Sequence, residues 1–123
     1  MPKGIGVDII EVDRIREAIE KYGERFLKRV FTPIEIKYCE EFKDTKFVHY
    51  TARFAAKEAF SKAIGTGFTQ GFKLNEVGIV NEPNGMPKVV LEGKLKEHWS
   101  NYRISVSLSH TRAYAVAVVI IEE

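Results

Sequence analysis

Hydrophobic and polar positions alternate near the start of the chain, in the segment GIGVDII. Ile5, Val7 and Ile9 alternate there with Gly6 and Asp8. An alternation of period two is typical of a β-strand, whose successive side chains point to opposite faces. The segment therefore predicts a strand that carries Asp8 on the face opposite the branched residues.

The period changes in the next segment, EVDRIREAIEKYG. Ile15, Ala18, Ile19 and Tyr22 follow the spacing i, i+3, i+4 and i+7, and Gly23 comes directly after them. This spacing lines one face of an α-helix, and glycine commonly ends a helix. The segment predicts an amphipathic helix that stops at Gly23.

Two further helices are predicted in the first half of the chain. Thr32, Pro33 and Glu35 have the spacing of a capping box, with proline at the first helical position. A long helix is then predicted over residues 47–64, and Gly65 is expected to end it.

The second half favours strands. Pro83 and the Asn84-Gly85 pair mark a tight turn between EVGIV and KVVLEG. KLKEHW is expected to form one or two helical turns, and two more strands are expected in RISVSLSH and AYAVAVVII. The order strand, helices, strands predicts an α+β fold, in which a mostly antiparallel sheet packs against a long helix and shorter helices.

Composition is consistent with a single globular domain over residues 1–123, because 45% of the residues are hydrophobic and 29% are charged. Neither a secretory leader nor a run of about 20 apolar residues is recognisable, so no membrane partner is expected. Cys39 is the single cysteine, which excludes an internal disulfide and favours a buried role in a reducing, cytoplasmic compartment. A net charge of +2 is too small to require nucleic acid.

The long helix carries a polar edge. At about 100° per residue, Lys57, Glu58, Ser61, Lys62 and Gly65 gather on one side of it. The simplest interpretation is a solvated face with an i, i+4 ion pair between Glu58 and Lys62. The three glycines of GTGFTQG favour a second interpretation, because lysine and serine beside exposed backbone N–H groups suit a phosphate.

A carboxylate among phosphate-binding groups needs an explanation. Glu58 would repel a phosphate unless a divalent cation lay between them, and Mg²⁺ typically binds one or two carboxylates together with phosphate oxygens. Asp8 is the candidate for the second carboxylate, since a charge within a strand is costly without a partner. A salt-bridged Asp8 remains an alternative, and Glu11 and Asp13 could be ligands or helix caps.

His110 ends a strand with a small polar face. Its other polar residues are Ser105, Ser107 and Ser109. Such a face leaves room for a flat ligand, although a lone histidine is more often structural. His49 and His98 have no supporting pattern and are interpreted as surface or packing residues. The turn around Asn84 is first a hairpin, whose backbone could also hold a base or a sugar.

Basic residues follow the first predicted helix. Arg14 and Lys21 share one stripe, and Arg25 is expected a turn further on. The stripe is either a solvated face, a docking surface for an acidic partner, or a nucleic-acid site. No aromatic residues interleave with the basic ones, as stacked bases would require.

Four segments together resemble a known family. They are GIGVDIIEVDRI, RFAAKEAFSKAIGTG, PNGMP and SLSHT, in this order and spacing. They resemble the 4'-phosphopantetheinyl transferases of the single-domain bacterial type, the holo-acyl-carrier-protein synthases.

The resemblance implies Mg²⁺-dependent transfer of 4'-phosphopantetheine from coenzyme A to a serine hydroxyl of apo acyl-carrier protein. Adenosine 3',5'-bisphosphate is released, and the reaction supports fatty acid biosynthesis. The resemblance also implies a homotrimer with its sites between subunits. A non-catalytic nucleotide- or nucleic-acid-binding module is the alternative from a different class.

The resemblance assigns roles residue by residue. Asp8 and Glu58 would hold Mg²⁺ against the pyrophosphate, and Lys62 would complete the catalytic set. Lys62 would also bind coenzyme A together with Ser61, Gly65, Asn84, Gly85, Pro87, Ser109 and His110.

Arg14, Lys21 and Arg25 fall where the family docks its acidic carrier protein. Lys21 stands there in place of an arginine, and Met86 stands where many members have lysine. Lys57 is left open, either as a ligand contact or as a solvated partner of Glu58.

Overall fold

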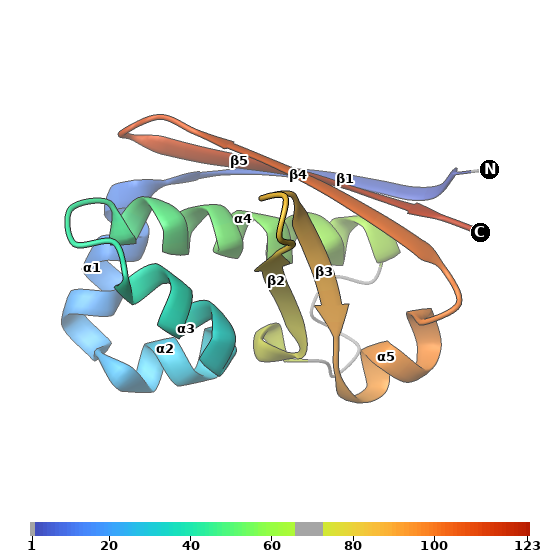
Figure 1. The fold of residues 1–123 in the computed structure, drawn as a ribbon, viewed down its shortest axis with the longest axis horizontal. Coiled ribbons are helices and arrows are strands. Elements are labelled where there is room, and N and C mark those ends of the chain that lie inside the picture. Colours follow the sequence, from blue (N-terminus) through green and yellow to red (C-terminus); the bar gives the residue numbers. More distant parts are fainter. Residues whose placement is uncertain (1, 66–72) are drawn as a thin grey trace.

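The computed structural model describes residues 2–65 and 73–123 (Figure 1). The helices are α1 (Val12–Tyr22), α2 (Glu24–Val30), α3 (Pro33–Glu40), α4 (Lys46–Ile64), the short 3₁₀ helix η1 (Leu74–Glu76) and α5 (Gly93–Trp99). The strands are β1 (Pro2–Glu11), β2 (Val77–Asn81), β3 (Pro87–Leu91), β4 (Arg103–His110) and β5 (Tyr114–Glu122). The predicted glycine-rich phosphate loop GTGFTQG, apart from Gly65, lies outside the described residues.

The long helix α4 is the centre of the molecule. An antiparallel sheet in the order β1-β5-β4 lies along one side of it, and α3 with the hairpin β2–β3 packs on another (Figure 1). The α+β prediction is confirmed, and every strand pair in the described residues is antiparallel. The predicted sheet is however divided in two, because in the described residues β2 and β3 pair only with each other.

Two glycines bring β1 unusually close to α4. A Cβ added to Gly4 would lie 1.9 Å from the carbonyl oxygen of Ala63, and one added to Gly6 would lie 1.9 Å from that of Ala59. Real side chains cannot occupy those positions, so backbone packs directly on backbone. This contact sets the distance at which Asp8, two residues further along the same face, meets the helix.

The predicted capping box of α3 is confirmed. The Thr32 hydroxyl accepts a hydrogen bond from the Glu35 N–H at 3.2 Å, and Glu35 Oε1 accepts one from the Thr32 N–H at 2.9 Å. Glu35 is nevertheless fully buried, which a carboxylate at an exposed helix start would not be. Its other partners are described below.

The predicted end of the first helix at Gly23 is confirmed, and it places the third basic residue of the stripe on a different helix from the other two. Gly23 has a φ of 57° and ends α1, and a separate helix, α2, begins at Glu24. Arg25 therefore lies on α2, whereas Arg14 and Lys21 lie on α1. A left-handed residue such as Gly23 redirects the chain, because it cannot continue a right-handed helix.

The outer face of the three-stranded sheet is apolar along β1 and β5, whereas β4 contributes serines to it. Ile5, Val7 and Ile9 of β1 are 66%, 56% and 63% exposed. Their neighbours on β5 are Ile120, Val118 and Val116. The predicted alternation is thus confirmed with the branched residues outward and Gly6 and Asp8 toward α4. Within the described residues, no helix has the length and apolar composition needed to cross a bilayer.

Candidate functional site

Asp8 and Lys62 meet where β1 passes α4. The Lys62 ammonium donates to Asp8 Oδ1 at 2.9 Å and to the Val7 carbonyl at 3.3 Å. Asp8 is 16% exposed, whereas Lys62 is 56% exposed. In the described part of the chain this ion pair replaces the predicted pair between Lys62 and Glu58, because Asp8 is brought close by the glycines that precede it.

Glu58 completes this cluster from the same edge of α4. Partial burial raises the pKa of its carboxyl above the ordinary value, and the nearby charge of Asp8 raises it further, while Arg14 and Lys62 oppose the shift. A carboxylate whose charge is disfavoured by a second carboxylate, next to a lysine, has the character of a cation site rather than of a structural ion pair.

The donor set fits a hard divalent cation. Asp8 and Glu58 supply carboxylate oxygens, and no group of three or more potential metal-ligating side chains occurs in the described residues. A cation held here would have to complete its shell with water and with oxygens of a substrate. Mg²⁺ is bound in this way in phosphoryl-transfer sites.

Lys57 has neither of the roles left open for it, because it is fully buried. Its ammonium lies 2.7 Å from Glu35 Oε1 in an ion pair with both side chains at 0% exposure. The prediction of a continuous open polar edge was wrong at Lys57 and also at Ser61, which is 2% exposed. α3 and β2 cover this side of α4.

Ser61 and Gly65 have structural explanations of their own. The Ser61 hydroxyl donates to the Glu58 carbonyl at 2.7 Å, so it is occupied by the helix backbone. Gly65 has a φ of 81° and forms the left-handed end of α4, which favours glycine regardless of a ligand. Their predicted contacts with coenzyme A stay predictions.

The hairpin loop between β2 and β3 is held by its own side chains. Asn84 Oδ1 accepts from the Met86 N–H at 3.0 Å, and Gly85 has a φ of 88°. The Asn81 side chain donates to the Gly85 carbonyl at 3.2 Å, and Pro87 pairs with Asn81 at the start of β3. The predicted turn is confirmed and presents an exposed backbone.

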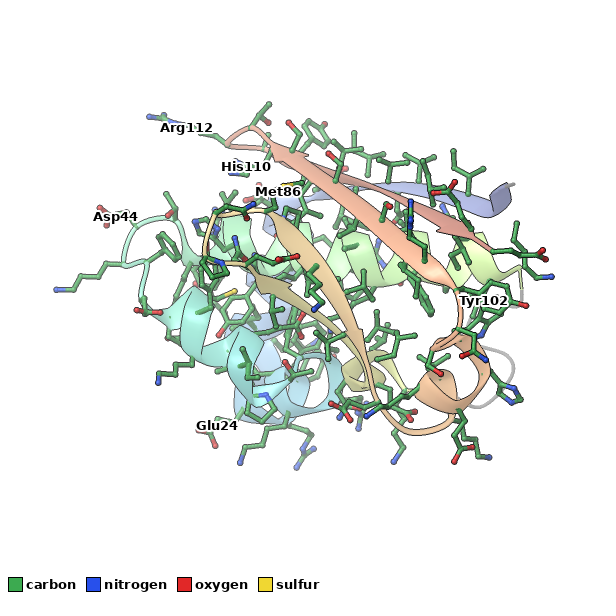
Figure 2. The ribbon with its side chains drawn as sticks, turned by 45° about the vertical axis from the view of Figure 1, so that its right-hand side comes forward. Glu24, Asp44, Met86, Tyr102, His110 and Arg112 are labelled. Carbon is green, nitrogen blue, oxygen red and sulfur yellow. The ribbon has the colours of Figure 1, made fainter. Side chains whose placement is uncertain are left out.

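His110 lies at the end of β4, and Figure 2 labels it together with Met86 of the hairpin loop. Its ring centroid is 5.9 Å from that of His49 on α4, and His49 stacks on Phe42 at 3.8 Å. Burial lowers the pKa of His49, and the positive charges of Arg53 and His110 add to this effect. His49 is therefore a packing residue, as predicted, while Ser109 is exposed on the outer face.

The predicted site residues form two groups on different sides of α4. Asp8, Glu58 and Lys62 make one group, and His49 connects the helix to His110 in the other. At about 100° per residue, position 49 lies on roughly the opposite side of α4 from positions 58 and 62. A ligand bound to Glu58 would have to wrap around α4 to reach His110 of the same chain.

Comparison with known proteins identifies the family. Residues 4–119 match the family described as the 4'-phosphopantetheinyl transferase superfamily. The chain belongs to this superfamily.

Similar members of the superfamily share a name. The chain is 52% identical to the holo-[acyl-carrier-protein] synthase of Ruminiclostridium cellulolyticum over 95% of this chain and 90% of that one. It is 45% identical to the enzyme of the same name from Koribacter versatilis over 98% of each.

Solved structures of the superfamily have the same fold. The holo-[acyl-carrier-protein] synthase of Neisseria meningitidis superposes with a TM-score of 0.90 at 32% identity, covering 100% of both chains. That of Bacillus anthracis, solved in complex with CoA (3',5'-ADP), gives a TM-score of 0.83 at 32% identity over 100% of this chain and 98% of that one.

Arg53 is a residue that the sequence reasoning missed in this superfamily member. It is 3% exposed, donates to Asn81 Oδ1 at 2.7 Å, and lies 4.2 Å from the centroid of the Tyr38 ring. Its Nε is buried without a hydrogen-bond partner in the described residues. A buried, incompletely paired guanidinium is unusual. An arginine directly before the alanine-rich segment FAAKEA was the available signal.

The basic residues predicted to dock a carrier protein are exposed. Arg14 and Lys21 lie on α1 and Arg25 on α2. Arg14 also acts electrostatically on Glu58, whose pKa it lowers. Of these three predicted docking residues, Arg14 therefore lies nearest the cluster of Asp8 and Glu58.

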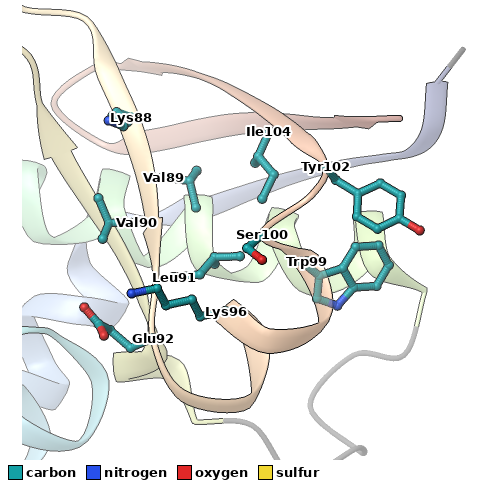
Figure 3. A pocket seen from close by; sticks show the side chains of 10 residues that line it. All are labelled: Lys88, Val89, Val90, Leu91, Glu92, Lys96, Trp99, Ser100, Tyr102 and Ile104. Carbon is teal, nitrogen blue, oxygen red and sulfur yellow. The ribbon is translucent and has the colours of Figure 1, made fainter.

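One pocket lies apart from all of these residues. It has a volume of about 400 Å³ and lies between β3, α5 and the start of β4 (Figure 3). Val89, Leu91 and Ile104 line it, together with Trp99 and Tyr102. It contains none of the residues predicted for metal, coenzyme A or carrier-protein binding.

Proposed function

We propose that this chain transfers 4'-phosphopantetheine from coenzyme A to a serine hydroxyl of apo acyl-carrier protein, as the names of its relatives indicate for those proteins. The observation that carries the proposal is the cluster of Asp8, Lys62 and Glu58, in a chain that belongs to the phosphopantetheinyl transferase superfamily. Residues 1–123 act as one domain, located in the cytoplasm, and serve fatty acid biosynthesis.

The reaction is a displacement at phosphorus. The oxygen of the carrier serine forms a bond to the phosphorus that bears the pantetheine. The bond from that phosphorus to the bridging oxygen of the pyrophosphate breaks, and adenosine 3',5'-bisphosphate leaves. The serine proton passes to a base. Such reactions depend chiefly on positioning and on neutralising charge.

Asp8 and Glu58 are the residues that would hold Mg²⁺, which when bound neutralises negative charge on the pyrophosphate. Lys62 neutralises Asp8 in the absence of a cation, as the 2.9 Å ion pair indicates. Because the Lys62 side chain is 56% exposed, its ammonium is also accessible to a phosphate oxygen of coenzyme A bound beside Asp8. Its ammonium then stabilises the negative charge that develops during transfer.

The adenosine end of coenzyme A requires the second group of residues. The exposed turn contains Asn84 and Gly85, and Pro87 follows it at the start of β3. The end of β4 carries Ser109 and His110. Arg53 has a buried Nε without a hydrogen-bond partner within the described residues. Because this group faces away from Glu58, we infer that a neighbouring copy of the chain supplies it.

A homotrimer meets this requirement, and the outer face of the sheet is the surface that would form it. Contiguous exposed apolar surface of this kind usually marks an interface. Val7→Glu is expected to convert the assembly to monomers and to abolish activity, because it places a charge on that face. Sedimentation velocity measures the mass. Val90→Glu, at another exposed valine, is the control and should leave the assembly intact. A monomeric parent protein, or an intact Val7→Glu trimer, would contradict the proposal.

The basic residues of α1 and α2 are proposed to dock the acidic carrier protein. Arg25→Glu is expected to raise KM for carrier protein about tenfold, roughly 1.4 kcal/mol, while KM for coenzyme A stays the same. Arg14→Glu should act similarly, with a further effect on kcat because it adjoins Glu58. Lys94→Glu, at an exposed lysine of α5, is the control. Equal changes in KM for both substrates would count against docking.

Mass spectrometry tests the function directly. Apo acyl-carrier protein incubated with coenzyme A, Mg²⁺ and this protein should gain the mass of one phosphopantetheine. No gain, together with salt-sensitive binding of RNA or DNA, would instead favour the alternative of a nucleic-acid-binding module.

A further inference from the structure

Lys57, the neighbour of Glu58, makes three hydrogen bonds to other parts of the protein. Its ammonium lies 2.7 Å from Glu35 Oε1, 3.2 Å from the Leu74 carbonyl and 2.5 Å from the Val77 carbonyl. A lysine has three donor hydrogens, so all of them are used. The partners come from α3, η1 and the start of β2.

Both carboxylate oxygens of Glu35 likewise accept hydrogen bonds. Its Oε1 also accepts from the Thr32 N–H at 2.9 Å, and its Oε2 accepts from the Ile79 N–H at 2.8 Å. One buried carboxylate therefore connects the start of α3, strand β2 and the middle of α4. No water is needed to satisfy either partner.

The stability of the fold does not by itself explain such a pair. Burial lowers the pKa of Lys57, and the charge of Glu35 works against that shift. Removing two charges from water costs several kcal/mol, and apolar replacements of buried ion pairs are often as stable as the pair itself. Where such a pair is retained, it can serve to select one arrangement of the elements that it joins.

On the opposite side α4 is held mainly by close packing on the sheet, and its hydrogen bonds there come from the exposed Lys62. Gly4 and Gly6 pack there on the backbone of Ala63 and Ala59, a contact without interlocking side chains. Hydrogen bonds, in contrast, are sensitive to direction. The bonds of Lys57 therefore define the rotation of α4 about its axis, and the next residue in the chain is Glu58.

We propose that Lys57 and Glu35 are a positioning pair, which fixes the rotation of α4 so that Glu58 and Lys62 face Asp8. Neither residue touches the substrate. The role rests on the proposed function, because it concerns the placement of the cluster that carries out transfer.

The test removes both charges and keeps the capping box. In Lys57→Met/Glu35→Gln, the glutamine oxygen can still accept from the backbone at the start of α3, as glutamine does in capping boxes. The variant should stay folded, with a kcat at least tenfold lower and an unchanged KM for carrier protein. All assays are run at a fixed interval below each variant's Tm, so that loss of stability cannot imitate the effect.

A matched control exists on the same two helices. Lys46 of α4 and Glu40 of α3 form a partly exposed ion pair at 3.5 Å. Lys46→Met/Glu40→Gln changes the same residue types and should keep the parent kcat. An equal loss of kcat in both double variants would overturn the proposal.

A structural readout separates this proposal from the proposed function. A crystal structure of Lys57→Met/Glu35→Gln should show α4 turned relative to β1 and a longer distance between Lys62 and Asp8. An unchanged distance, or an unchanged kcat, overturns the positioning role. If the double variant does not fold, Glu35→Gln alone is measured in the same way. If the parent protein makes no holo-carrier protein, the function fails and the crystal structure still decides the positioning.

Discussion

Glu58→Gln is expected to lower kcat about 100-fold or more while leaving the fold intact, since losses of this size follow removal of one charge-stabilising group. The amide keeps the size of the carboxylate but cannot share a cation with Asp8. Asp8→Asn should have a comparable effect. Holo-carrier-protein formation is followed by mass spectrometry over time. Near-parent turnover by both variants would contradict the metal assignment.

The same variant should be more stable than the parent at neutral pH without Mg²⁺. The folded-state pKa of Glu58 is raised by burial and by Asp8, so the folded protein holds this proton more tightly than the unfolded chain does. Ionisation therefore opposes folding above the ordinary carboxyl pKa, and glutamine removes that cost. The gain in Tm should disappear as the pH falls below about 4, where both states are protonated. Glu20→Gln, at an exposed carboxylate of α1, is the control.

Gly6→Ala is expected to have the largest effect on stability. The new Cβ would lie 1.9 Å from the Ala59 carbonyl oxygen, a backbone atom that can move only if β1 and α4 separate. A cost of about 3 kcal/mol is at the upper end for overpacked cores, and it would lower Tm by roughly 10 °C. Thermal unfolding followed by circular dichroism measures it.

Gly78→Ala is the matched control for this substitution. Its Cβ would meet Thr32 Cγ2 at 3.3 Å, and a side-chain methyl can shift by a few tenths of an ångström. A change within about 1 kcal/mol is expected there. Equal losses at both glycines would show that the β1–α4 contact is less tight than the structure indicates.

Local sequence patterns predicted the elements well. The period of two in GIGVDII, the Thr32–Glu35 capping box and the end of α4 at Gly65 are all confirmed. These features depend on residues within one turn or one strand of each other. The sequence therefore contains the information locally.

What the sequence could not predict depends on distant residues. A helical wheel shows which side Lys57 occupies, but not that Glu35, 22 residues away, covers it. The helical wheel also placed Ser61 on a solvent-exposed face, because a wheel carries no information on what packs against each side of the helix. The separation of the β2–β3 hairpin from the sheet of β1, β5 and β4 is likewise a tertiary property.

The break at Gly23 divides the proposed docking residues between two helices. Arg14 lies on the helix that adjoins Glu58, but Arg25 lies beyond the break on α2. The sequence of α2 can therefore diverge to suit a different carrier protein without altering the positions of Asp8, Glu58 or Lys62. The contribution of α2 to carrier preference can therefore evolve, or be engineered, with little effect on the catalytic rate.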